Sequence, residues 1–508
     1  MSKEYIVAFD SGTQSVKTII FSKYGKILGE GHSPHLVSVP GPMKAEQDPN
    51  QWWTAFCDSL KSALRESRIT ADRIVAVGIT TQRETMCVVD SEGRPLLPAQ
   101  VWYDARPLEQ VEWIKDKFGA ERYMEVTGRM PDTTWWVSKV LWVRDKERNV
   151  FDHAHKFLTV QGYFIYKLTG EFKDSYASPT GLLDMSTMDY SMELIDAFGI
   201  PREKLCDLVP PGTIIGYISS KAAEETGLVE GTPVASGAGD QQAGGLGAGL
   251  TEPGAAYLNL GTSVVLGVIS SKFRYHRNFF VREGCIPGTW NFEALINGGF
   301  WMVTWFKENF AQVEVNAASS LGLPPEVILD LKAKDLPPGS QGLIVQPYWL
   351  GVRQPYWDEK ARGTIMGWNN AHTKIHLYRA ILEGIGYDIR LNLDGIQEAL
   401  ETVVDDIRIF GGGAKSDFSC QIMADILNKS VRRTETPEAT TLGAAILAAS
   451  AVKLHPSVKD AANAMARVSA RFDPRKENVD IYAKLYGNIY RRLYPAVQPL
   501  LRELWPSH

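Results

Sequence analysis

The alternation of apolar and polar positions produces one pattern twice along the chain. Val7 to Phe21 read VAFDSGTQSVKTIIF, and Ala256 to Ser270 read AYLNLGTSVVLGVIS. Each has an apolar run, a polar residue, a Gly-Thr corner and a second run rich in β-branched residues, which predicts a β-hairpin with a tight turn. Such a turn presents backbone N–H groups and a hydroxyl to phosphate oxygens. One hairpin alone is common, but two copies predict a duplicated architecture that holds one polyphosphate between its halves.

The rest of the first half alternates strand-like and helix-like segments. A helix is expected over Asn50–Glu66, with Asn50 as its capping residue. Buried strands are expected at Ile74–Ile79 and Met86–Val89. Ligands of α/β sheets bind at the carboxyl ends of strands, so the polar segments 82–85 (QRET) and 101–106 (VWYDAR) are candidates for a site. Two further helices are expected near Leu108–Lys117 and Trp136–Lys146.

The second half repeats this plan. We expect helices over Trp301–Phe310 and Lys374–Leu400, strands over Gly342–Gln346 and Ile407–Phe410, and a helix that starts at Ser416 or Asp417. A small-residue helix (Thr441–Leu454) and an amphipathic helix (Tyr482–Trp505) follow. The Gly-rich segment Gly231–Gly254 is expected to be the flexible hinge between the halves.

Composition narrows the class of protein. A chain of 508 residues is long enough for two or more domains. The 54 basic and 59 acidic residues nearly balance, which argues against nucleic acid or an anionic membrane surface as a partner. No apolar run reaches membrane-spanning length, and the first residues enter a strand without room for a signal peptide, so we expect a cytoplasmic protein. The five scattered cysteines lack C-x-x-C spacing, which predicts buried thiols rather than disulfides or a zinc site.

The first hairpin carries residues suited to phosphoryl transfer, which needs positioned phosphates, a divalent cation and a group that deprotonates the acceptor hydroxyl. Asp10 offers a carboxylate for Mg²⁺, directly or through water. The turn from Gly12 to Ser15 offers backbone and hydroxyl groups, and Lys17 offers a cation. An ordinary hairpin with a polar turn is the alternative.

Two further glycine-rich corners follow strands. Asp240 stands where a strand ends and a helix of small residues begins, a position suited to a general base, although an N-cap Asp is the alternative. At Phe410–Ala414 a glycine turn would let an adenine or ribose approach the backbone, although a tight strand-to-helix junction is the favoured interpretation of this motif alone. Neither corner matches G-x-G-x-x-G, and the chain has no P-loop pattern.

These motifs, taken in order, resemble the FGGY carbohydrate kinases of the actin-like ATPase superfamily. The matching segments are DSGTQSVK (10–17), TTQRET (80–85), VWYDAR (101–106), SKVLW (138–142), GAGDQQAG (237–244), NLGTS (259–263), ARGTIMGW with HLYRAILEG (361–386), FGGGAKSDFSCQIMADIL (410–427) and EATTLGAAILA (438–448). The resemblance implies an α/β fold of two ribonuclease-H-like domains around a central cleft. Residues 1–248 would bind the sugar and supply the first phosphate hairpin, and residues 249–508 would bind the nucleotide.

The resemblance also implies a role for each matching residue. Asp240 is the general base for the sugar hydroxyl, and Asp10 helps to hold Mg²⁺. The residues implied for ATP are Thr13, Gln14, Ser15, Lys17, Gly261, Thr262, Gly412 and Ser416. Those implied for the sugar or polyol are Arg83, Glu84, Trp102, Asp104, Asp240 and Gln241. The resemblance is also compatible with assembly into a homodimer.

The sequence departs from both familiar patterns of this family. Arg83-Glu84 replaces the Met-His pair usual in xylulokinases and favours glycerol kinase. The segment Thr133–Trp136 lacks the Tyr expected in glycerol kinases, and Asn297–Phe306 lacks a Gln expected before its second Trp. We therefore expect a terminal-hydroxyl kinase for a pentulose such as D-xylulose. Glycerol or another polyol is the alternative substrate, and a non-catalytic, nucleotide-gated sugar sensor is the alternative class. Trp102, Trp135 and Trp136 offer apolar faces to a sugar, with core packing as the alternative.

Overall fold

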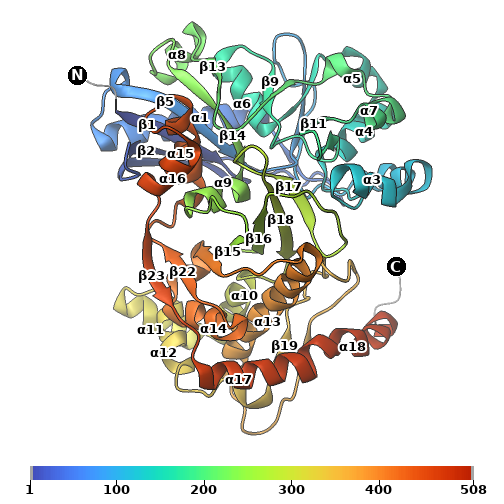
Figure 1. The fold of residues 1–508 in the computed structure, drawn as a ribbon, viewed down its shortest axis with the longest axis vertical. Coiled ribbons are helices and arrows are strands. Elements are labelled where there is room, and N and C mark those ends of the chain that lie inside the picture. The colour runs from blue at the N-terminus through green and yellow to red at the C-terminus, as the bar shows by residue number, and fades with distance from the viewer. Residues whose placement is uncertain (1–3, 505–508) are drawn as a thin grey trace.

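The computed structural model describes residues 4–504 and has two halves, each built on one sheet (Figure 1). The first sheet has the strand order β13-β14-β5-β1-β2-β3, and the second has the order β17-β18-β16-β15-β21-β22-β23. The first sheet comprises β1 (Tyr5–Ser11), β2 (Ser15–Ser22), β3 (Ile27–Pro34), β5 (Ile74–Thr81), β13 (Ile214–Tyr217) and β14 (Pro233–Gly239). The second comprises β15 (Ala255–Leu260), β16 (Val264–Ser270), β17 (Phe280–Glu283), β18 (Trp290–Ile296), β21 (Asp406–Phe410), β22 (Val431–Thr434) and β23 (Val468–Phe472).

The two sheets correspond strand by strand. The hairpin β1–β2 matches β15–β16, and β3 matches β18, all antiparallel. On the other side β5 and β14 match β21 and β22, all parallel to the first strand of their hairpin, and β13 and β23 are the antiparallel edges. Only β17 extends the second sheet. The duplicated architecture and the α/β fold class expected from the sequence are confirmed.

Two helices of small residues each pack against the sheet of the opposite half of the chain. Helix α15 (Ala439–Ala451) belongs to the second half of the chain, but its Leu442 and Ala444–Ala449 pack on the first sheet (Figure 1). Helix α9 (Asp240–Gly247) directly follows a strand of the first sheet, and the chain beside it packs on the second sheet around Tyr257. The two helices touch so closely that a Cβ on Gly443 would lie 1.9 Å from the carbonyl oxygen of Ala243. Glycine and alanine are thus required here for close packing.

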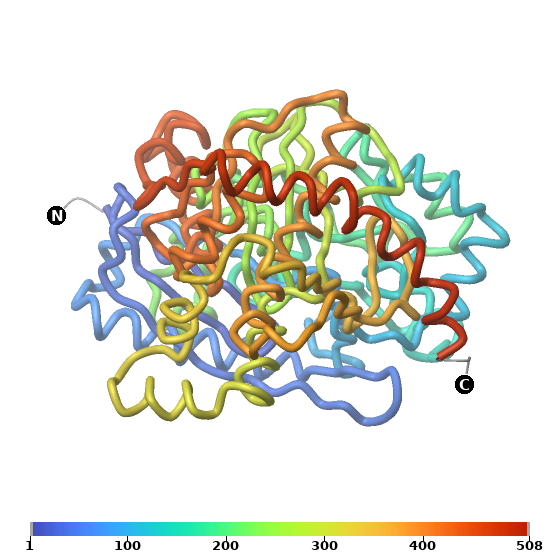
Figure 2. Tube along the Cα trace, turned by 90° about the horizontal axis from the view of Figure 1, so that it is seen from below, coloured from blue at the N-terminus to red at the C-terminus, as the bar shows by residue number. Residues whose placement is uncertain are grey.

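Larger helices cover the opposite faces. Helices α1 (Pro49–Ser67) and α6 (Val160–Thr169) lie on the first sheet, and α13 (Lys374–Leu400) and α14 (Asp417–Leu427) lie on the second. Helices α17 (Lys476–Leu485) and α18 (Arg491–Leu504) run across the second half as one long path (Figure 2). The other helices are α2 (Leu108–Trp113), α3 (Ala120–Thr127), α4 (Trp136–Lys146), α5 (Arg148–His153), α7 (Met192–Phe198), α8 (Ser220–Thr226), α10 (Trp301–Phe310), α11 (Gln312–Leu321), α12 (Pro325–Ala333) and α16 (Val458–Met465).

Short strands complete the structure. A small sheet in the first half has the order β4-β7-β6-β8, and three two-stranded pairs stand outside the main sheets. The bounds are β4 (Glu46–Gln47), β6 (Met86–Val89), β7 (Ala99–Gln100), β8 (Lys156–Thr159), β9 (Lys173–Ser175), β10 (Leu183–Asp184), β11 (Asp189–Tyr190), β12 (Asp207–Val209), β19 (Ile344–Gln346) and β20 (Thr364–Met366).

Most elements expected from the sequence are confirmed, and one detail is corrected. The first helix is capped by Asp48, whose side chain accepts a hydrogen bond from the N–H of Asn50, so Asn50 is not the cap. Within Gly231–Gly254, the expected strand end and small-residue helix are present as β14 and α9, and the hinge stays a prediction for the residues outside these two elements. The expected last helix begins within α17, and its final residue, Trp505, lies outside the described residues. All five cysteines are buried free thiols, and no helix within residues 4–504 is long and apolar enough to cross a membrane.

Candidate active site

Three parallel strands of the first sheet end at the same edge. In the register of β1, β5 and β14, Thr81 is level with both Ser11 and Gly239. The N–H of Gln82 donates a 2.8 Å hydrogen bond to the carbonyl of Ser11. This register brings together Asp10, the segment that begins at Gln82, and Asp240. From the sequence, their proximity could be predicted only from the general rule that ligands bind at the carboxyl ends of strands.

The turn of the first hairpin is held by side chains from outside it. Gln47 donates a 2.6 Å hydrogen bond to the carbonyl of Thr13, and a ring nitrogen of His35 lies 3.1 Å from the carbonyl oxygen of Gly12. Trp102 Nε1 donates to Thr13 Oγ1 at 3.0 Å. Lys17, on β2, forms a 2.8 Å ion pair with Glu438 at the start of α15. The turn of the first hairpin is therefore held in position by contacts within the protein.

Asp10 has the environment of a cation ligand. Its Oδ1 is buried without a hydrogen-bond partner. Burial, together with the negative charges of Asp240 and Glu438, raises the pKa of Asp10 to about 8, although Lys17 opposes the shift. A divalent cation would satisfy the orphaned oxygen and favour the ionised carboxylate, so the residues fit Mg²⁺. Within the described chain no three His, Cys, Asp or Glu side chains gather as a metal site, and Mg²⁺ commonly completes its shell with water and phosphate.

Asp240 is the first residue of α9 and is 31 % exposed. Its Oδ1 lies 3.3 Å from Arg83 Nε, and its Oδ2 accepts a 3.0 Å hydrogen bond from Gln241 Nε2. Burial raises the pKa of Asp240 above its usual range, although Arg83 opposes this. A carboxylate with a raised pKa is a stronger proton acceptor, as a general base must be.

Gln241 connects Asp240 to the second hairpin. Its Oε1 accepts a 2.9 Å hydrogen bond from Asn259 Nδ2. Asn259 occupies the place in β15 that Asp10 has in β1, and an ionised Asp at this position could not donate this hydrogen bond. The difference in residue type between the two hairpins therefore has a structural reason.

A cluster of buried charges joins the halves beside Asp240. Arg83 Nη1 lies 2.9 Å from Glu293 Oε2, and Arg282 Nη1 lies 2.5 Å from Glu84 Oε1. Arg129 also pairs with Glu283 at 3.1 Å. Burial and the nearby charge of Arg83 lower the pKa of Arg282 to about 10. Arg83, Glu84 and Arg129 come from the first half, and their partners come from β17 and β18.

Sequence reasoning missed Arg282 and Glu293, which complete this cluster. Both are at most 2 % exposed. Charged residues within the apolar strands β17 (FVRE, with Arg282) and β18 (WNFEALI, with Glu293) were the available signal, because charged residues are rarely buried unless they are paired. Glu84, expected to be an open acceptor for substrate hydroxyls, is already paired with Arg282. It also has a φ of +62°, a strained conformation for a residue with a side chain.

The aromatic residues of the expected sugar pocket divide into two groups. Trp102 is half-buried next to Thr13, whereas Trp135 and Trp136 are each only 1 % exposed. Trp135 packs against Arg282, whose guanidinium lies 5.1 Å from its ring. Asp104 is completely buried and accepts hydrogen bonds from Arg106 and from the N–H of Ala45. Asp104 therefore holds the loop around Trp102.

The second hairpin opens into a cavity of about 860 Å³. The backbone N–H groups of Phe300 and Trp301, at the start of α10, donate to the carbonyls of Gly261 and Thr262. Gly412, which has no atom within 4 Å of the position a Cβ would take, lies on another wall. The expected nucleotide residues Gly261, Thr262, Gly412 and Ser416 all line this cavity, together with Phe300, Trp301, Trp305 and Tyr378.

Comparison with known proteins agrees with this geometry. Residues 5–247 match the N-terminal domain, and residues 256–452 the C-terminal domain, of the FGGY family of carbohydrate kinases. A glycerol kinase of Thermococcus gammatolerans is 32 % identical over 95 % of this chain and 96 % of its own length. A xylulose kinase of Bacillus subtilis is 28 % identical over 95 % of both chains. The structure of a ligand-bound xylulose kinase from Lactobacillus acidophilus superposes with a TM-score of 0.90 over 99 % of this chain and 100 % of its own, at 24 % identity.

Proposed function

The chain belongs to the FGGY family of carbohydrate kinases, phosphotransferases that act on hydroxyls of sugars or polyols, and from this premise we propose its reaction. It transfers the γ-phosphate of ATP to a terminal hydroxyl of a small linear sugar, with a pentulose such as D-xylulose as the substrate. The observation that carries the proposal is the edge of the first sheet. There Asp240, with its raised pKa, lies beside Asp10 and is linked through Gln241 to the hairpin that opens into the nucleotide-sized cavity.

In the proposed step, Asp240 receives the proton that the acceptor hydroxyl loses. The carboxylate accepts the proton of the sugar hydroxyl as that oxygen bonds to the γ-phosphorus, and the bond from this phosphorus to the bridging oxygen of ADP breaks. Mg²⁺, held with the help of Asp10, would neutralise the charge of the phosphates when bound. The turn residues Thr13, Gln14 and Ser15, with Lys17, would contact the transferred group.

Exclusion of water is a further part of the proposal. Closure of the halves around sugar and nucleotide would prevent hydrolysis of ATP. The irregular residues 248–254, between α9 and β15, are the connection at which the chain would bend. A radius of gyration that falls when both ligands are added, measured by small-angle scattering, is the expected result.

The choice of a pentulose is supported by the residues that differ from the glycerol-kinase pattern. The segment 133–136, in which that pattern has a Tyr, contains Trp135 here, which packs against Arg282, and Glu84 is paired with Arg282 rather than open. Arg83 keeps donors beside Asp240 that suit adjacent hydroxyls. Glycerol is the second candidate, because the Arg83-Glu84 pair matches that pattern and several relatives are glycerol kinases.

The deciding experiment compares kcat/KM for D-xylulose, D-ribulose, glycerol, erythritol and gluconate in a coupled assay of ADP release. A pentulose should be the best substrate. A clear preference for glycerol would select the second candidate, and a preference for gluconate would overturn a neutral substrate. A non-catalytic sugar sensor would bind nucleotide without any turnover stimulated by these compounds.

A further inference from the structure

Arg83 lies between a carboxylate of each half of the chain. Its Nη1 donates hydrogen bonds to both carboxylate oxygens of Glu293, at 3.0 and 2.9 Å, and to Gln242 Oε1 at 3.0 Å. Its Nε lies 3.3 Å from Asp240 Oδ1, but among the described residues no hydrogen bond joins these two side chains. The guanidinium is therefore bound to Glu293 and only close to Asp240.

Packing holds Arg83 in this position. The side chain of Arg83 is 10 % exposed, and that of Glu293 is fully buried. A Cβ on Gly239 would lie 2.3 Å from the Cδ of Arg83, so the arginine runs directly along the end of β14. Glu293 is held in turn by the hydroxyl of Tyr257, which donates a 2.6 Å hydrogen bond to its Oε1. The two charged groups are therefore fixed relative to each other.

The ion pairs around Arg83 form one network. Arg282 connects to it, because its Nε lies 3.5 Å from Glu293 Oε2 and its Nη1 lies 2.5 Å from Glu84 Oε1. Within residues 4–504 the network contains two cations, Arg83 and Arg282, and three carboxylates, those of Glu84, Glu293 and Asp240. It therefore has one carboxylate more than it has cations. Asp240 is the most exposed of the three carboxylates and lies farthest from its nearest cation.

Charged groups from three elements act on Asp240, namely Arg83 and Glu84 after β5, Glu293 on β18 and Asp10 on β1. Burial is the main cause of the raised pKa of Asp240, and the carboxylates of Glu84 and Glu293 add to the rise. The guanidinium of Arg83 opposes it. A hydrogen-bonded ion pair between Arg83 and Asp240 would lower this pKa and make Asp240 a weaker proton acceptor. The position of the guanidinium therefore affects how strong a base Asp240 can be.

We propose that Glu293 is a positioning residue for the transfer reaction, because it holds Arg83 where this cation can bind the sugar without forming a hydrogen-bonded ion pair with Asp240. The donors left to Arg83 are Nε and Nη2, neither of which donates a hydrogen bond within the described residues. These donors suit hydroxyl groups of the acceptor next to the base. Glu293 belongs to the second half, so the contact between the halves preserves the strength of the base in the first half. This role rests on the proposed function of Asp240, whereas the contacts between Arg83 and Glu293 do not.

The test is Glu293→Gln, which keeps the size of the side chain and removes its charge, so that Arg83 should pair with Asp240. The readout is the acidic limb of the profile of kcat/KM against pH, where activity is lost as the base becomes protonated. This limb should move to lower pH by about one unit or more, because a nearby opposite charge lowers the pKa of a carboxyl by about 1–3 units. On the plateau kcat should fall about tenfold, since a weaker base accepts the proton less readily. The substrate is the best of the five compounds compared above.

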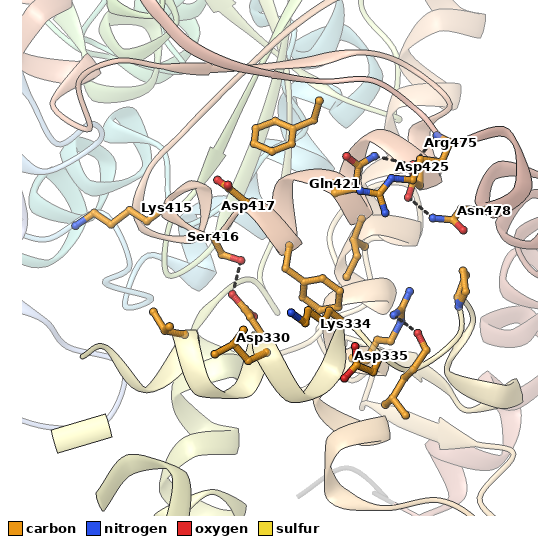
Figure 3. A pocket seen from close by; sticks show the side chains of 18 residues that line it. Asp330, Lys334, Asp335, Lys415, Ser416, Asp417, Gln421, Asp425, Arg475 and Asn478 are labelled. Atoms are coloured by element: carbon orange, nitrogen blue, oxygen red, sulfur yellow. Dashed lines mark hydrogen bonds between the residues drawn. The ribbon is translucent and has the colours of Figure 1, made fainter. Parts of the chain in front are cut away.

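Asp425→Asn is the matched control. Asp425 lies on α14 beside a cavity of about 960 Å³ between α12, α14 and the start of α17 (Figure 3). It is also a buried carboxylate, but it accepts hydrogen bonds from the neutral side chains of Gln421 and Asn478 and from the backbone N–H of Arg475. Loss of its charge frees no guanidinium, so the acidic limb should stay at the pH of the parent.

A second variant, Arg83→Met/Glu293→Gln, removes one charge of each sign and leaves Arg282 paired with Glu84. It therefore stays informative if Glu293→Gln alone folds poorly. With no guanidinium beside Asp240, its acidic limb should lie at the pH of the parent or above it. Its KM for the sugar should rise about tenfold, because the buried donors of Arg83 are lost.

The outcomes separate the role of Glu293 from that of Asp240. An acidic limb that is unmoved in Glu293→Gln would overturn the proposal, as would a limb that moves to lower pH equally in the single and the double variant, because the shift would then not depend on Arg83. If Asp240→Asn kept both the activity and the acidic limb of the parent, the proposed base itself would be refuted, a result that needs no variant of Glu293.

Discussion

The two hairpins share one backbone plan and differ in what surrounds their turns. The first turn is held by side chains, namely His35, Gln47 and Trp102, and has the buried carboxylate of Asp10 beside it. The second is held by the backbone N–H groups at the start of α10 and has the amide of Asn259 in the equivalent place. The turn proposed to hold phosphate is thus present twice, while the acid proposed to hold a cation is present in one copy only.

This difference shows how one supersecondary structure serves two tasks. Asp10, the acid of the first hairpin, lies near Asp240, the group that accepts the proton in the proposed reaction. The second hairpin borders an aromatic cavity, and its amide donates to Gln241, which in turn donates to Asp240. A second acid at Asn259 would lose that donated hydrogen bond and add repulsion near Asp240.

The largest expected effect comes from removing the base between the hairpins. Asp240→Asn should lower kcat by about 10²–10⁴-fold, because the amide cannot accept the hydroxyl proton. Its Kd for ADP should stay close to that of the parent in calorimetry. Asp388→Asn is the control, since it also removes a buried carboxyl whose pKa is raised, to about 7, but lies in α13. Turnover of Asp240→Asn within a few-fold of the parent would refute the assignment.

The next test exchanges the residues that distinguish the hairpins. Asp10→Asn should raise the Mg²⁺ concentration needed for half-maximal activity by about 10–100-fold, as losses around metal sites commonly do. Asn259→Asp should leave this requirement nearly unchanged, because the new acid belongs to the nucleotide side. Mg²⁺ titrations of both variants would reveal the opposite order if the cation were held by the second hairpin.

A smaller effect is expected on the nucleotide side alone. Gly412→Leu places a side chain in open space within the cavity and should raise KM for ATP about tenfold, through steric exclusion of the nucleotide. KM for the sugar should not change. Gly487→Leu, also at an open position but in the π-helical segment Tyr486–Tyr490 between α17 and α18, is the control. A rise in sugar KM alone would show that the cavity has been assigned to the wrong substrate.

The smallest effect concerns the stability of the metal-free protein. The pKa of Asp10 is about 8 in the folded protein and about 4 in the unfolded chain. The folded state thus binds more protons between these values, and the free energy of unfolding falls as pH rises from 4 to 8. Asp10→Asn removes this penalty, so its Tm relative to the parent should increase by roughly 2–4 °C between pH 4 and 8 in EDTA. Mg²⁺ should reduce the difference, and a constant difference across this range would contradict the pKa shift.

The sequence predicted the elements whose local pattern decides their structure. Helix α13 and both hairpins have long apolar periodicity, so their positions follow from the chain alone. In the segment Gly231–Gly254 the role of the glycines could not be assigned from the sequence, because flexibility and close packing both favour glycine. Here Gly443 and its counterparts on α9 allow close contact between helices, a use that depends on a partner about 200 positions away along the chain.

The positions of the candidate site residues could be predicted where they follow from the end of a strand. Asp240 and Asp10 could be singled out, because each follows or ends a buried strand. The pairing of Glu84 with Arg282 could not, since it joins two halves whose relative placement no local pattern encodes. For the same reason, the sequence did not separate Trp135 and Trp136, which are buried, from Trp102, which stands at the first turn.

The exchange of α15 between the halves has a consequence for synthesis of the protein on the ribosome. Strands β1, β5 and β14 are complete once residue 239 has been made, but one face of their sheet is covered by α15, which ends at Ala451. At translation rates of about 5–20 residues per second, roughly 10–40 s pass before that helix can emerge. During this interval Ile6, Ala8 and Ile19 lack their native cover, so the nascent first half is a natural substrate for chaperones that bind exposed apolar sheets.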